Sequence, residues 1–80
     1  YEVKTESGGT VTFIDNRKIA KVAKLAGAPS ATVAGVLMRV SLNKTVRSGQ
    51  TIFEIHAQAK GELAYSLGYL SDNKDIIRIK

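Results

Sequence analysis

The chain has 80 residues, no cysteine and a formal net charge of +5, from 12 lysines and arginines against 7 aspartates and glutamates. This length suits a single domain, residues 1–80, with a thin core. The lack of cysteine excludes disulfides, thiolate metal sites and a cysteine nucleophile, and it fits a cytoplasmic protein. No run of about 18 apolar residues is present, so we expect no contact with a membrane.

The first two segments are predicted to be strands. Residues Tyr1–Thr5 and Thr10–Ile14 alternate their side chains with the period of two that is typical of half-buried strands. Ser7-Gly8-Gly9 between them predicts a tight turn. A phosphate loop of the P-loop kind would need more glycines and a lysine that leads into a helix, and neither follows here.

A helix is predicted from Arg17 to Ala26. Asp15 or Asn16 can accept hydrogen bonds from its first free N–H groups. Gly27 is expected to close the helix as a left-handed C-cap, and Pro29 prevents its continuation. One face should pack onto the sheet, because apolar side chains recur at spacings of three and four. These side chains are Ile19, Val22, Ala23 and Ala26.

The same helix carries a basic side formed by Lys18, Lys21 and Lys24. Arg17 and Lys18 also lie in the first turn, where the helix dipole disfavours positive charge. Two interpretations stay open. Lys18 and Lys21 could contact an anion or an acidic neighbouring surface, or the lysines could form a solvated face.

A polar turn around Gly49 organises the second half of the chain. Glycine reaches positive φ without a Cβ clash, so Ser48-Gly49-Gln50 is predicted to reverse the chain. Residues 28–34 are predicted to be a loop, Val36–Leu42 a strand before the turn, and the segment that ends near Ala57 a strand after it. The side chains expected to face inward are Val36, Met38, Val40 and Leu42 before the turn, and Phe53, Ile55 and Ala57 after it.

A second helix is predicted over Lys60–Leu70, followed by a closing strand over Ile76–Lys80. Leucines at i, i+4 and i+7 mark the apolar side of this helix, with Ala64 beside them. Tyr65 and Tyr69 lie one turn apart, where they could stack a base or pack at the edge of the core. The inward residues expected here are Leu63, Leu67 and Leu70 on the helix and Ile77 and Ile79 on the strand.

The predicted order is strand, strand, helix, strand, strand, helix, strand. Hairpins separated by two covering helices indicate an α+β domain with a mostly antiparallel sheet. His56 is the only histidine, and a catalytic triad needs a nucleophile and an acid placed around it. One histidine without a thiolate also makes a poor metal site. We therefore predict no catalytic residue, no metal site and no cofactor.

Several strings, in order, resemble the C-terminal domain of the pyrimidine nucleoside phosphorylase family, which includes thymidine phosphorylases and archaeal AMP phosphorylases. They cover the chain from Gly9 to the last strand. Arg39 stands where the family often has histidine and Asn43-Lys44 where it often has Gly-Asp, so the subgroup and substrate stay open; asparagine tolerates the left-handed conformation of such a turn. The strings are Gly9-Thr10-Val11, Ile14-Asp15, Ile19-Ala20, Leu25-Ala26-Gly27-Ala28, Ala34-Gly35-Val36, Lys44 to Gln50 and Ile52 to Ala57.

The resemblance implies a hammerhead-like α/β domain at the C-terminal end of an enzyme that transfers a pentosyl group from a base to phosphate. The substrate groups would bind to the preceding domains of that parent, so no catalytic residue is carried over onto this chain. The parent is expected to be a homo-oligomer in the cytoplasm. The Gly27-Ala28-Pro29 loop and the terminal strand look closer to the archaeal members.

Two alternatives of other classes remain open. A biotinyl or lipoyl carrier domain shares the turn, glycine and strand pattern, but it would need an exposed lysine in a hairpin, typically beside methionines, and Met38-Arg39 matches this only weakly. A basic nucleic-acid-binding module would use the positive charge. Charge alone does not make a site, and we expect no nucleic-acid partner.

Overall fold

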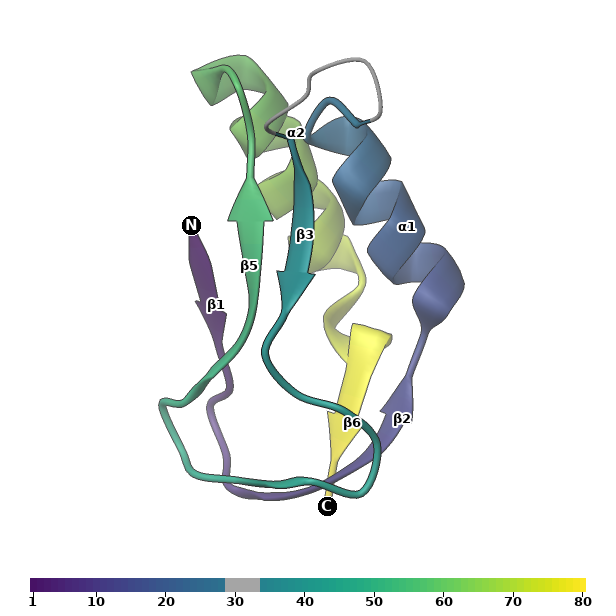
Figure 1. The fold of residues 1–80 in the computed structure, drawn as a ribbon, viewed down its shortest axis with the longest axis vertical. Coiled ribbons are helices and arrows are strands. Elements are labelled where there is room, and N and C mark those ends of the chain that lie inside the picture. Colours follow the sequence, from purple (N-terminus) through teal and green to yellow (C-terminus); the bar gives the residue numbers. More distant parts are fainter. Residues whose placement is uncertain (29–33) are drawn as a thin grey trace.

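The computed structural model describes residues 1–28 and 34–80 (Figure 1). Its elements follow the predicted order, with a short additional strand and one turn of 3-10 helix. They are β1 (Glu2–Lys4), β2 (Gly9–Ile14), α1 (Asn16–Leu25), β3 (Gly35–Met38), β4 (Thr45–Val46), β5 (Thr51–His56), α2 (Lys60–Asp72), η1 (Lys74–Ile76) and β6 (Ile77–Ile79).

The strands form two antiparallel sheets of three strands each, in the orders β1-β5-β3 and β4-β2-β6. Figure 1 shows α2 behind β3 and β5, α1 beside α2 on the β3 side, and β2 and β6 of the second sheet at the lower end of the molecule. The predicted α+β class with antiparallel pairing is confirmed. The strands form two separate sheets and not the single sheet that was expected.

The division arises where the chain leaves β3. The predicted strand Val36–Leu42 is wrong beyond Met38, although the Arg39 N–H still donates to the Ile52 carbonyl at 3.0 Å. Leu42, expected inside, is 54% exposed. The chain has crossed to the other sheet by this point, so the alternation of β3 no longer decides which side chains are buried.

The crossing segment, residues 39–50, is held to the second sheet by backbone hydrogen bonds. The Asn43 N–H donates to the Val11 carbonyl at 2.8 Å, and the Val11 N–H donates to the Lys44 carbonyl at 2.9 Å. Asn43 has a φ of +70°, which is the left-handed conformation that asparagine is expected to tolerate. Next, β4 pairs with β2 before the chain returns.

The return is the predicted turn at Gly49. The Gln50 N–H donates to the Arg47 carbonyl at 3.0 Å, and Gly49 has a φ of +83° at the third position of this turn. A positive φ there is the signature of a type II turn. The Gly49 N–H donates to the Thr5 carbonyl at 2.8 Å, and the Thr5 N–H donates to the Gln50 carbonyl at 3.0 Å. The turn therefore fastens the segment after β1 as well.

Helix α1 has the predicted caps. The Asp15 carboxylate accepts from the Lys18 N–H at 3.1 Å, which selects Asp15 over Asn16 as the N-cap. At the other end the Gly27 N–H donates to the Lys24 carbonyl at 3.0 Å and the Ala28 N–H to the Ala23 carbonyl at 3.1 Å. With a φ of +118° at Gly27, this is a Schellman motif. Pro29 and most of the predicted loop lie outside the described residues.

The two helices meet through small and apolar side chains. Val22 of α1 and Ser66 of α2 are fully buried, and the Ser66 hydroxyl lies 3.3 Å from the Val22 carbonyl oxygen. Ala64, expected on the inner side, is exposed. The predicted leucines are half-buried around Ser66, and α2 continues two residues past Leu70. The fully enclosed core consists of Val11, Val22, Ala26, Val46, Ile52, Phe53, Ile55, Ile76 and Ile77.

The last strand begins at Ile77 rather than Ile76, because Ile76 completes the turn η1. Ile77 is buried and Ile79 is half-buried, as predicted. Here β6 pairs with β2 at an irregular register between Val11 and Phe13. This shift turns Phe13 outward, where the Arg78 guanidinium lies 5.0 Å from the centre of its ring.

Gly9 allows β2 to pass close to the end of β6, and this yields a stability prediction. A Cβ at Gly9 would lie 2.4 Å from the Lys80 carbonyl oxygen, and its φ of +149° strains any other residue. We expect Gly9→Ala to lower the free energy of unfolding by about 2 kcal/mol or more. Gly68→Ala, in α2 with open space around it, should instead raise that free energy by up to about 1 kcal/mol. Urea titrations measure both, and a Gly9→Ala chain as stable as the wild type would contradict the close approach.

Candidate functional site

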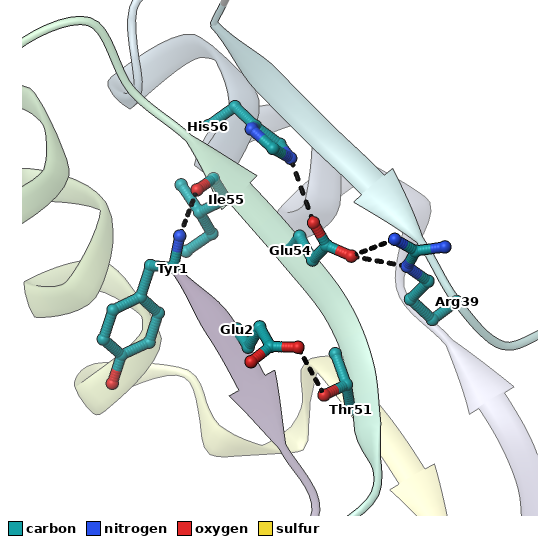
Figure 2. Close-up of polar contacts among 7 residues, drawn as sticks. All are labelled: Tyr1, Glu2, Arg39, Thr51, Glu54, Ile55 and His56. Atoms are coloured by element: carbon teal, nitrogen blue, oxygen red, sulfur yellow. Dashed lines mark hydrogen bonds and ion pairs between the residues drawn. The ribbon is translucent and has the colours of Figure 1, made fainter.

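A polar cluster lies on the face of the first sheet that points away from the helices. Side chains alternate along β5, so Phe53 and Ile55 enter the core while Glu54 and His56 point outward. Arg39 follows the end of β3, the strand beside β5, and reaches the same place. We call Arg39, Glu54 and His56 the outer cluster; Figure 2 shows how these side chains converge on the Glu54 carboxylate.

The carboxylate is the centre of the outer cluster. Its Oε2 accepts a hydrogen bond from Nε of Arg39 and forms an ion pair with Nη2 of the same side chain, and its Oε1 lies 3.2 Å from Nε2 of His56. The Glu54 side chain is 17% exposed, whereas those of Arg39 and His56 are about half exposed. The hydrogen bond from Arg39 lowers the pKa of Glu54; partial burial opposes this, and the charge of Arg39 and the contact with His56 add to the lowering. Glu54 is therefore held as a carboxylate.

Within residues 1–28 and 34–80, the side-chain hydrogen bonds and ion pairs of the outer cluster are among its own three members. A nucleophile must lie within hydrogen-bond distance of its base, and the contacts of His56 and Glu54 are with each other and with Arg39. Across residues 1–28 and 34–80, no group of three or more His, Cys, Asp or Glu side chains could hold a metal ion. The geometry fits a polar contact surface.

The predicted contact residues Lys18 and Lys21 lie elsewhere, on α1. Nζ of Lys18 is 3.0 Å from Oδ1 of Asp75, and Nη2 of Arg78 is 3.8 Å from Oδ2 of the same carboxylate. The hydrogen bond from Lys18 lowers the pKa of Asp75, and the charges of Lys18 and Arg78 reinforce this. Lys21 is exposed and makes no ion pair within the described part of the chain. Neither lysine adjoins the outer cluster.

Sequence reasoning missed the outer cluster. The two faces of each strand were predicted, and Glu54 and Arg39 were each on an outward face. Their contact depends on the register that pairs Leu37 with Glu54. The periodicity of each strand assigns its two faces, but it does not by itself fix which residue of β3 lies opposite which residue of β5.

Two other features bear on the interpretation. Tyr65 is 71% exposed and Tyr69 is half-buried, so these tyrosines do not form one exposed stacking surface. No helix in the described residues is long and apolar enough to cross a membrane.

The lowered pKa of Glu54 predicts a pH dependence of stability. A carboxyl group with a lower pKa in the folded chain stabilises it above the unfolded value, near 4.5, and this stabilisation is lost as pH falls through the folded value. We therefore expect Glu54→Gln to be less stable than the wild type at pH 7, and the difference to shrink below about pH 4.5. Urea midpoints from pH 3 to 7 measure it.

Glu2→Gln is the matched control, because the Glu2 carboxylate on the same sheet accepts from the Thr51 hydroxyl at 3.2 Å and makes no ion pair within residues 1–28 and 34–80 (Figure 2). A difference for Glu54→Gln that stays constant with pH, or one that Glu2→Gln reproduces, would contradict the role of the Arg39 contact.

Comparison with known proteins gives the context of this domain. No protein-family model matches the sequence. A protein of Hahella chejuensis named "putative thymidine phosphorylase" is 50% identical over 80 residues, which is 100% of this chain and 16% of that protein. Proteins with the same name from Ralstonia nicotianae and Tolumonas auensis are 56% and 47% identical over 85% and 90% of the chain, and the chain spans 13% and 14% of their lengths.

The chain thus spans about one-sixth or less of the length of the curated relatives that it matches. Identity at this level over nearly every element requires the same fold and the same core. The chain is therefore homologous to one segment of these proteins, and the resemblance to the pyrimidine nucleoside phosphorylase family that its sequence predicts is confirmed.

Proposed function

We propose that the chain is a non-catalytic C-terminal accessory domain of a nucleoside phosphorylase, an enzyme that transfers a pentosyl group from a base to phosphate. One observation carries the proposal, namely 44–56% identity to proteins named "putative thymidine phosphorylase", of which the chain matches 13–16%. These names favour thymidine as the substrate of the parent. The nucleotide preference of an AMP phosphorylase is the alternative.

The contacts of the outer cluster support placing the reaction outside that cluster. The reaction needs a clamp for phosphate and a preorganised environment for a sugar that develops positive charge. In the outer cluster the one carboxylate is neutralised by Arg39, and the nearby His56 also contacts it. The domain would instead support the preceding domains, affect their closure or contribute to subunit contacts. A homo-oligomeric parent in the cytoplasm is part of the same proposal.

Base release by the full-length protein tests this function. With phosphate present, we expect the full-length protein to release thymine from thymidine, and residues 1–80 alone to release none. Glu54→Gln and His56→Gln in the full-length protein should keep kcat within about threefold of wild type, since neither residue would touch substrate. A loss of about 100-fold in either variant with an unchanged oligomer would contradict a non-catalytic role. AMP and uridine as substrates distinguish the alternatives.

The basic side of α1 gives a second test. Charge reversal by Lys18→Glu with Lys21→Glu should weaken phosphate or nucleotide binding by the full-length protein if these lysines contact an anion. Lys21 is expected to contribute more, because Asp75 already pairs with Lys18. Lys60→Glu, at an exposed lysine of α2, is the control. Isothermal titration measures the affinities, and unchanged isotherms for the double variant would remove the anion-contact interpretation.

A further inference from the structure

A shallow, open surface pocket of about 400 Å³ lies against the crossing segment, between the end of β3 and the start of β4. The side chains that supply its chemistry are Arg39, Ser41, Lys44, Thr45 and Gln50. Two of them are cations, of which Arg39 is also paired with Glu54, and Met38 and Val40 complete the lining. We propose that this cavity binds a small ligand that carries a phosphate group.

Three of the lining side chains have hydrogen-bond donors that a ligand in the cavity could use. Arg39 uses Nε and Nη2 on Glu54, and Figure 2 shows its third nitrogen directed away from that carboxylate. The Gln50 side-chain oxygen accepts from the Arg47 N–H at 2.9 Å, which leaves the amide NH₂ group as a donor. Lys44 is exposed and makes no ion pair within residues 1–28 and 34–80.

These groups match a phosphate better than other ligands. A phosphate presents several acceptor oxygens, and it is bound by cations together with hydroxyl and amide donors. The cavity volume lies in the range of small-molecule sites, about 300–1,000 Å³. Its two cations are too few for the row of phosphate contacts that holds a nucleic acid.

Glu54 has a positioning role in this site. Its carboxylate holds the Arg39 guanidinium from the side opposite to the third nitrogen, so the outer cluster and the cavity share one residue. The crossing segment brings Lys44 to the same place through the bond from the Val11 N–H to the Lys44 carbonyl. The proposal does not depend on the proposed function, because binding is measured without turnover.

Amide-resolved NMR titration of the chain with inorganic phosphate, against chloride at equal ionic strength, tests the site. We expect saturable shifts at Ser41, Lys44 and Thr45. Lys44→Gln should raise the dissociation constant about tenfold or more, because it removes one charge-assisted hydrogen bond. Lys74→Gln, an exposed lysine of η1, is the matched control and should leave the constant unchanged.

Further ligands identify the source of the phosphate group. The same titration is repeated with ribose 5-phosphate, a nucleoside monophosphate and a short RNA. The small ligand with the lowest dissociation constant identifies the chemical class that the cavity binds. Non-saturating shifts, shifts spread over all lysines, or an equal loss in Lys74→Gln would overturn the proposal, as would a preference for RNA. Arg39→Gln is informative if its spectrum keeps the dispersion of the folded chain; otherwise Lys44→Gln decides alone.

Discussion

The structure depends on the backbone hydrogen bonds that tie the crossing segment to both sheets. Residues 39–50 leave β3, bond to Val11 of β2 through Asn43 and Lys44, and return by a turn that bonds to Thr5. Each such bond contributes only about 0.5–1.5 kcal/mol, but together they join two small sheets into one unit. Short three-stranded sheets need a shared core to be stable, and Val46 and Val11 belong to that core because the segment crosses.

Two residues with positive φ make this path possible. Asn43 and Gly49, at +70° and +83°, stand at the points where the segment turns into and out of the second sheet. The same path determines the surface. It carries Arg39 toward Glu54 and brings Lys44 to the same pocket as Arg39.

Local sequence signals were sufficient to predict the helix caps and the turn, but not the pairing of the strands. Asp15, Gly27 and Gly49 act through their own backbone and nearest neighbours, so the cap, the helix end and the turn could be predicted. The division into two sheets could not, because the choice of partner strand depends on residues far apart in the chain. Ser66 was missed for a similar reason. A serine on a leucine-rich helix has no apolar signal, and its burial follows from the closeness of α1.

The candidate sites show the same limit. Lys18 and Lys21 were chosen from helical spacing, yet the partner of Lys18 is Asp75, which lies 57 residues further along the chain. The outer cluster also needed a register that only the folded chain defines. The family, in contrast, was recognisable because ordered strings along most of the chain carry more information than any single motif.

Amide hydrogen exchange tests most directly whether the crossing segment unites the two sheets. The informative N–H groups are those of Asn43 and Val11, which bond across the junction, and that of Ile55, which bonds to Tyr1 inside the first sheet. We predict that the three exchange with free energies within about 1 kcal/mol of one another, because they open only with the whole domain. Exchange of Asn43 and Val11 that is orders of magnitude faster than that of Ile55 would contradict this, since the sheets would then be separate units.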